Sequence, residues 1–437
     1  MKNNLEKRVM RKVTLRIVPF IMLLYFIAFL DRVNIGFAAL TMNEDLGLSP
    51  TVFGLGAGIF FFGYFLCEVP SNLILHKVGA RIWIARVMIS WGLVSACMIF
   101  VQGTTSFYVL RFLLGVAEAG FFPGIILYLS YWFPAMKRAQ VTALFMAAAP
   151  ISTALGSPIS AALLELDGVL GYAGWKWMFV LEALPALIFG VVVLFYLTDK
   201  PEKAKWLTNE ERTWLQTTMA AETQQRAAAH NSHSSAWKGL ADKRVLALAL
   251  VYFGTSAGLY TLGIWAPQII KSFGASSLET GFLNACPAVV GVIGMVLWAR
   301  HSDRRNERTW HVMGACLLAA VGLVYAGNVS TLFSVILALT LVTVGISASK
   351  PPLWSMPTLF LSGPAAAAGI ATINSIGNLG GFFGPTMIGI IREQTGSYTG
   401  GLYFVAALLV LSAVIVLILS RHTVKPQGTS LPHPRTH

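Results

Sequence analysis

Charged side chains are scarce in this sequence. Asp, Glu, Lys and Arg make up 12% of the 437 residues, whereas a soluble domain carries about 25%. Hydrophobic residues account for 56% of the chain. This combination excludes an ordinary soluble protein and indicates a chain embedded in a lipid bilayer.

Cysteine pairs and nucleotide-binding motifs are also absent from the sequence. The four cysteines (Cys67, Cys97, Cys286 and Cys316) all fall in long apolar stretches without a CxxC pair, so they predict neither a metal site nor a disulfide framework. No GxxxxGK[ST] loop occurs, which leaves ATP-driven transport unsupported. We expect no metal, no cofactor except a coupling ion, and no enzyme, because no nucleophile–base pair or metal cluster lies in these stretches.

Long apolar stretches recur along the whole chain. A helix needs about 20 such residues to cross the hydrocarbon core. The strands of an outer-membrane barrel would be shorter and would alternate in polarity. The sequence therefore predicts an all-α membrane protein with twelve spans, near 17–40, 52–75, 82–101, 107–133, 139–163, 176–197, 245–270, 280–299, 311–328, 332–358, 366–391 and 400–420.

Basic residues are distributed unevenly over the connections between these spans. If the N-terminus is cytoplasmic, most of the 32 Lys and Arg residues lie on the cytoplasmic side. Only Lys176, Lys271 and Arg392 then lie in connections on the opposite side. This is the positive-inside distribution, and the even number of spans puts both termini in the cytoplasm. It accounts for most of the net charge of +13, so the charge does not indicate nucleic-acid binding.

One long polar connection divides the chain into two halves. We predict a six-helix half at 1–198, a cytoplasmic linker at 199–244, and a second six-helix half with a tail at 245–437. The basic loops "NLILHKVGAR" and "ARHSDRRNER" occupy equivalent places in the two halves. Such internal repeats are typical of transporters, whose site lies near mid-membrane between the repeats.

Seven ionisable side chains lie within the predicted spans, although burying a charge in a membrane is costly. In the first and fourth spans, two acids and two arginines can balance one another. A purely structural ion-pair network remains an alternative, but intramembrane carboxylates more often belong to proton relays or substrate pathways. The seven residues are Asp31, Arg32, Glu68, Arg111, Glu118, Glu182 and Lys350.

Several motifs, in order and correctly spaced, resemble the major facilitator superfamily and its anion:cation symporters of organic acids. They are "FLDRVNIGFA", "GARIW", "RFLLGVAEAGFFPG", "GWKWMFVLEALPA", "DKPEKAKWLTNEER", "LWSMPTLFLSG" and "AAGIATINSIGNLGGFFGP". The resemblance implies two six-helix halves in a bacterial inner membrane. It assigns proton coupling to Asp31 and Glu118, and substrate binding to Arg32 and Arg111. Loop residues that resemble the family's gating motifs are His76, Gly79, Arg81, Asp303 and Arg304; His76 is a departure, because the family usually has Asp there.

Further positions are weaker candidates for substrate contact. Tyr64 and Trp354 match family cavity residues, and a packed aromatic is the alternative for Tyr64. Asn374, Ser375 and Asn378 can bond hydroxyl or carboxylate oxygens, or other helices. For Glu68 and Glu182 we favour a structural role.

Lys350 precedes two prolines, which we expect to kink its helix. It departs from the family pattern. It is either a lysine that reaches toward the membrane interface or a cation on the second half of the cavity. In the second case, it would bind the far carboxylate of a substrate with charges at both ends, such as tartrate.

The sequence thus predicts a monomeric transporter that imports a small organic acid with protons by alternating access. Tartrate, another dicarboxylate or a sugar acid is the expected substrate. A uniporter or exchanger for an aromatic acid such as phthalate or hydroxyphenylacetate is the alternative. A membrane-embedded enzyme is the alternative from a different class.

Overall fold

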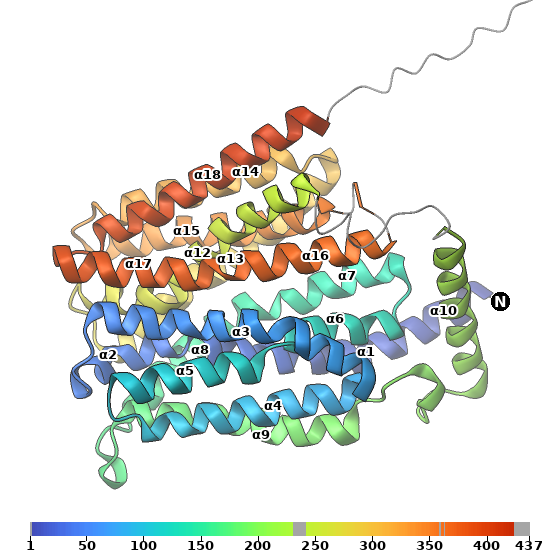
Figure 1. The fold of residues 1–437 in the computed structure, drawn as a ribbon, viewed down its shortest axis with the longest axis horizontal. Coiled ribbons are helices and arrows are strands. Elements are labelled where there is room, and N and C mark those ends of the chain that lie inside the picture. The colour runs from blue at the N-terminus through green and yellow to red at the C-terminus, as the bar shows by residue number, and fades with distance from the viewer. Residues whose placement is uncertain (1, 230–241, 358–359, 362, 424–437) are drawn as a thin grey trace, which may run out of the picture.

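The computed structural model describes residues 2–229, 242–357, 360–361 and 363–423, together with most of their side chains. Within these ranges the secondary structure is helical, without strands. Figure 1 shows the long helices lying side by side along the longest axis. The helices are α1 (Lys2–Val33), α2 (Ile35–Asp45), α3 (Pro50–Val78), α4 (Ala80–Ala96), α5 (Thr104–Glu118), α6 (Phe121–Trp132), α7 (Ala135–Met146), α8 (Ala148–Leu164), α9 (Gly174–Tyr196), α10 (Asn209–Ala229), α12 (Lys243–Lys271), α13 (Ser277–Arg305), α14 (Thr309–Ala326), α15 (Leu332–Ser355), α16 (Gly363–Asn378), α17 (Gly380–Thr395) and α18 (Thr399–Thr423).

The predicted spans all appear as helices. In the described residues, 11 helical segments are long and apolar enough to cross a membrane. The remaining predicted span, 366–391, is divided between α16 and α17, which have 16 residues each. Large apolar side chains such as Phe195 (82% exposed) and Phe333 (78% exposed) lie on the outer surface, where lipid covers them in a membrane protein.

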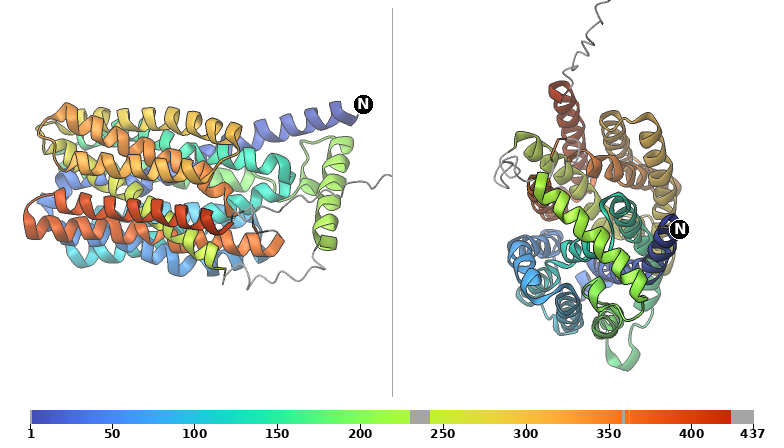
Figure 2. Two further views of the ribbon diagram at one scale, coloured as in Figure 1. Left: turned by 90° about the horizontal axis from the view of Figure 1, so that it is seen from above. Right: turned by 90° about the vertical axis from the view of Figure 1, so that its right-hand side faces the viewer.

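Helix α10 marks one end of the bundle. It lies across the ends of the other helices, next to the start of α1 (Figures 1 and 2). Lys12 Nζ on α1 donates a hydrogen bond to Glu211 Oε2 on α10 at 2.9 Å. We call this end the α10 end, and the opposite end, where α2 ends and α3 begins, the far end. The spans before α10 are the N-terminal spans and those after it the C-terminal spans.

Four of the predicted spans are interrupted along their length. At Asn34, Ala147 and Leu379 the backbone keeps right-handed helical angles, so the chain does not unwind there. The fourth interruption, at Ala119 and Gly120, is a true break, because Gly120 adopts a φ of 89° that side-chain-bearing residues avoid. Discontinuous helices of this kind form the binding sites of many transporters.

The break at Ala119 and Gly120 is stabilised by a neighbouring helix. Ser71 on α3 donates its hydroxyl to the Ala119 carbonyl at 2.7 Å and accepts a hydrogen bond from Trp83 Nε1 at 2.9 Å. The broken helix frees backbone carbonyls that have no water to bond in a membrane. Ser71 therefore compensates for part of the cost of ending α5 at Glu118.

The N-terminal and C-terminal spans pack tightly at the far end. Gly36 on α2 is so close to α12 that a Cβ there would collide with the carbonyl oxygens of Gly263 and Ile264. Three further pairs of groups bond across the same end. They are Ser49 Oγ to Glu393 Oε2 at 2.7 Å, Lys271 Nζ to the Leu40 carbonyl at 3.0 Å, and Asn284 Nδ2 to Ser157 Oγ at 2.9 Å.

Toward the α10 end, the described residues form one polar bridge between the two sets of spans. Glu68 on α3 accepts hydrogen bonds from Asn374 Nδ2 at 2.6 Å and from Ser375 Oγ at 2.8 Å, both on α16. The far end is therefore closed by extensive packing, while the α10 side of the centre depends on this bridge. The division of the chain into the domains 1–198, 199–244 and 245–437 stays a prediction.

Candidate substrate and proton site

Arg32 forms a buried ion pair near the middle of the bundle. It lies in the last turn of α1, and its Nη2 donates to Oε1 of Glu118, the last residue of α5. Its Nη1 donates to the Tyr260 hydroxyl on α12 at 3.0 Å. The guanidinium also lies over the rings of Phe60 and Tyr64, at 5.6 and 5.3 Å. Arg32 thus joins the two sets of spans at the point where two helices end.

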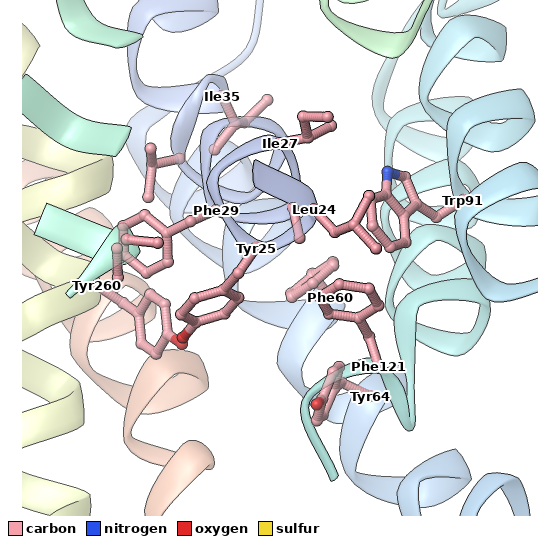
Figure 3. Close-up of a cluster of buried hydrophobic side chains, with 14 of the residues drawn as sticks. Leu24, Tyr25, Ile27, Phe29, Ile35, Phe60, Tyr64, Trp91, Phe121 and Tyr260 are labelled. Carbon is pink, nitrogen blue, oxygen red and sulfur yellow. The ribbon is translucent and has the colours of Figure 1, made fainter. Parts of the chain in front are cut away.

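Aromatic side chains enclose this part of α1. Figure 3 shows Phe60, Tyr64, Trp91 and Tyr260 around the helix, contributed by several different helices. Tyr64, 3% exposed, contacts Arg32 through its ring. Because an apolar surrounding strengthens electrostatic interactions, the Arg32–Glu118 pair is held in an environment that favours keeping it intact.

Arg111 is fully buried but forms no ion pair within the described residues. Its Nε and Nη2 donate to the carbonyls of Gly56 and Ala57 at 3.4 and 3.3 Å, and its guanidinium lies 5.1 Å from the centre of the Phe60 ring. Its Nη1 is buried without a partner there. A buried donor without a partner is costly, so Arg111 is a candidate ligand for an anionic oxygen.

Asp31 is also buried without a cation at ion-pair distance in the described structure. It accepts hydrogen bonds from Ser95 Oγ at 2.5 Å and from Asn34 Nδ2 at 3.2 Å. The expected balance of two acids and two arginines is therefore only half present: Arg32 pairs with Glu118, whereas Asp31 and Arg111 bond to neutral groups. Adjacent residues on a helix point about 100° apart, and Asp31 consequently faces other helices than Arg32 does.

The candidates on α16 and α15 have different surroundings. Asn374 and Ser375 bond to Glu68, which thereby gains a bridging position between the two sets of spans. Asn378, one turn further along α16, is buried. Trp354 packs edge-on against Tyr252 with ring centres 4.9 Å apart, and its Nε1 is buried with no partner among the described residues.

Lys350 lies half-buried on α15, which continues as a helix through Pro351 and Pro352 to Ser355. Within the described residues its ammonium makes no hydrogen bond or ion pair. The two prolines do not end the helix. Because its ammonium has no partner among the described residues, Lys350 is a candidate ligand for an anion.

The loop residues expected to act in gating form two separate clusters. Gly79 separates α3 from α4. Arg81 pairs with Asp199 at 3.6 Å, and its backbone N–H donates to the same carboxylate at 3.1 Å. Arg81 thus has an acidic partner in Asp199. The side chain of His76 lies outside the described part of the structure.

The equivalent loop of the C-terminal spans contains an ion pair of its own. Asp303 pairs with Arg308 at 2.7 Å, and Arg308 Nη1 also donates to Ser302 Oγ at 2.8 Å. Arg304 is exposed and makes no ion pair in the described structure.

Three residues of the site were not singled out from the sequence: Asn34, Tyr260 and Asp199. Asn34 lies within the motif "FLDRVNIGFA", so its polarity in an apolar run was an available signal. Asp199 begins the motif "DKPEKAKWLTNEER", but the motif does not reveal its pairing with Arg81, and Tyr260 carries no signal, because its partner is far away in the sequence.

A bundle of membrane-crossing helices with charged groups buried where its two sets of spans meet has the architecture of a multi-pass membrane transporter. The profile of the Major Facilitator Superfamily matches residues 21–385, and the chain belongs to this family. It is therefore a transporter, and not an enzyme.

Known proteins resemble the chain over nearly its full length. Two proteins of Agrobacterium vitis, each named "Putative tartrate transporter", are similar to it. One is 75% identical over 98% of this chain and 94% of its own length. The other is 74% identical over 99% of both. Among solved structures, a D-xylose-proton symporter is similar in fold, with a TM-score of 0.74, 16% identity, and coverage of 92% of this chain and 97% of that one.

Proposed function

We propose that the protein imports a small organic-acid anion of the tartrate class together with protons, by alternating access. The observation that carries this proposal is the buried Arg32–Glu118 pair beside Arg111, whose Nη1 has no hydrogen-bond partner among the described residues. The names of the Agrobacterium vitis relatives support tartrate as the substrate class. Sequence motifs such as "FLDRVNIGFA" and "RFLLGVAEAGFFPG" support membership of the anion:cation symporter group.

Coupling follows from a difference between the two partners of the ion pair. Glu118 can take up a proton, whereas Arg32 keeps its charge at all accessible pH values. When Glu118 is protonated, Arg32 is released to bind a carboxylate, for which its planar fork is well suited. When Glu118 loses the proton, it competes for Arg32 again and the anion is expelled. Proton uptake and anion binding thus favour one another.

Alternating access is supported by the unequal packing at the two ends. The far end is closed by α2, α3 and α8 against α12, α17 and α13, while the bridge of Glu68 to Asn374 and Ser375 lies on the α10 side. We infer that this conformation opens toward the α10 end when the bridge separates. The distribution of basic residues favours a bacterial inner membrane protein with both termini on the cytoplasmic side. The α10 end, where α1 starts, then faces the cytoplasm, and this opening delivers substrate there.

The test is transport by the purified full-length protein in liposomes. Labelled tartrate should accumulate under an inward proton gradient, and a protonophore should abolish the accumulation. Flux that ignores the gradient would instead identify a uniporter or an anion exchanger. Stronger competition by phthalate or hydroxyphenylacetate than by tartrate would identify an aromatic acid as the substrate. Sedimentation of the active form tests whether it is a monomer.

Lys350 provides a test of substrate charge. If its ammonium binds the second carboxylate, Lys350→Gln should weaken uptake of tartrate by about tenfold or more, the equivalent of ~1.4 kcal/mol. Uptake of a monocarboxylic sugar acid should change much less, and Lys350→Arg, which keeps the charge, should retain the preference. An equal effect on both substrates would remove Lys350 from the site. The measurement is the apparent KM for each acid in liposomes.

A further inference from the structure

A second group of buried acids lies beside the Arg32–Glu118 pair and contains no cation in the described structure. Asp31 on α1 and Glu182 on α9 are each 3% exposed. Asn34 connects them, because its Nδ2 donates to Asp31 Oδ1 at 3.2 Å and to Glu182 Oε2 at 2.9 Å. Two carboxyl groups that accept from one nitrogen lie within twice a hydrogen-bond length of each other.

Serine hydroxyls complete the network from two further helices. Ser95 Oγ on α4 donates to Asp31 at 2.5 Å, and Ser160 Oγ on α8 donates to Glu182 Oε1 at 2.6 Å. All these donors are neutral. A carboxylate that is buried without a cation is costly, and two of them at this distance also repel each other.

The surrounding charges do not remove this cost. Within the described residues, the charged groups that interact electrostatically with Asp31 are Glu118 and Arg111. The one that interacts in this way with Glu182 is Asp31. Arg111 directs two of its nitrogens to backbone carbonyls of α3 and makes no ion pair with Asp31 in the described structure. A bound proton therefore lowers the cost of burying these two acids more effectively than the distant guanidinium of Arg111 does.

The hydrogen-bond inventory of Asn34 points the same way. Both hydrogens of its amide are used, while its Oδ1 is buried with no donor within the described residues. A buried acceptor without a partner is costly. A protonated carboxyl group is a donor, whereas a carboxylate can only accept. A proton on either acid thus provides the kind of group that the network lacks.

We propose that Asp31 and Glu182 form one proton-binding pair, in which one proton is retained throughout the cycle and a second is taken up and released with the substrate. The second proton comes from solution on the entry side and returns to solution on the other, and only an O–H bond forms and breaks. Glu182 is then a proton-coupling residue, and Asn34 is the positioning residue that holds the two acids together. This inference rests on the proton coupling proposed above.

The direct test is infrared difference spectroscopy of the full-length protein in lipid bilayers over a range of pH. A protonated carboxyl group shows a C=O stretching band that a carboxylate does not have. Glu182→Gln should remove a band of a protonated carboxyl group that the native protein retains at neutral pH. Asp31→Asn should shift the protonated carboxyl band that remains in that variant. Glu165→Gln, an identical change at an exposed position at the end of α8, should leave the protonated bands unchanged.

Transport provides a second, independent arm. Glu182→Gln should lose proton-driven accumulation and keep counterflow exchange, and Glu182→Asp should restore accumulation. A structural acid predicts that both activities decline together, in proportion to lost protein. If native uptake ignores the proton gradient, the proposed coupling is wrong, while the infrared bands still decide whether the two acids share a proton.

Two results would overturn the pair. The first is loss of carboxylate bands alone on Glu182→Gln, at every pH at which the protein is active. The second result applies if Glu182→Gln does not fold, in which case Ser160→Ala replaces it. Ser160→Ala removes one hydrogen-bond donor to Glu182, keeps both acids, and should shift the band of the protonated carboxyl group. An unchanged spectrum for Ser160→Ala would then count against the proposal.

Discussion

Replacement of Arg32 by Gln should lower the free energy of unfolding by about 3–5 kcal/mol, because it leaves the Glu118 carboxylate buried without its cation. Glu118 is 2% exposed, and within the described residues its ion-pair partner is Arg32. The measurement is denaturant-induced or thermal unfolding of the purified protein in detergent. Arg304→Gln is the matched control, since Arg304 is exposed without an ion pair in the described structure, and it should change stability by less than about 0.5 kcal/mol.

The double variant Arg32→Gln/Glu118→Gln separates the pair from the individual side chains. Removal of both charges should recover much of the stability, because no uncompensated charge remains. A double variant that is no more stable than Arg32→Gln alone would show that packing around Arg32, and not its pairing, is responsible. Arg32→Lys keeps the charge and should fold, yet it should transport poorly, since an ammonium lacks the planar fork that binds a carboxylate.

Glu118→Gln should abolish proton-driven accumulation of substrate. A fixed neutral amide cannot take up and release a proton, so Arg32 no longer alternates between Glu118 and the anion. Asp31→Asn should have the same effect on accumulation. Counterflow exchange, which needs no net proton movement, should survive in at least one of the two variants. The measurement is uptake and counterflow in liposomes that contain equal amounts of folded protein.

The result that contradicts this prediction is also specific. If both variants fail to yield a monodisperse protein, the acids belong to a structural network, and their coupling role has no support. If both fold and still accumulate substrate, the proton enters elsewhere in the protein.

The sequence predicted the spans and the charged centre, but it could not predict which charges pair. Spans are visible because a bilayer demands about 20 consecutive apolar residues. Pairing depends on how the helices are rotated against one another. Asp31 and Arg32 are neighbours in the chain, yet one bonds to Ser95 and Asn34 and the other to Glu118 and Tyr260.

Partners that are distant in the sequence were missed for the same reason. Arg81 obtains its acid from Asp199, at the start of the long connection, because α4 begins beside the end of α9. The break at Gly120 was also not predicted, although the glycine is visible in the sequence, because many glycines in membrane helices only permit close packing. Whether the proposed site residues bind substrate stays a prediction that the variants above will test.

The bridge from Glu68 to Asn374 and Ser375 has a consequence for the speed of the transporter. If cargo leaves toward the α10 end, these two hydrogen bonds must break in every turnover. Hydrogen bonds to a charged group contribute about 1.5–3 kcal/mol each, and each ~1.4 kcal/mol of barrier is a tenfold change in rate. Under this proposed direction of release, a weaker bridge would make release faster but would let the closed state leak, so the chemistry of one glutamate would set a compromise between throughput and tightness.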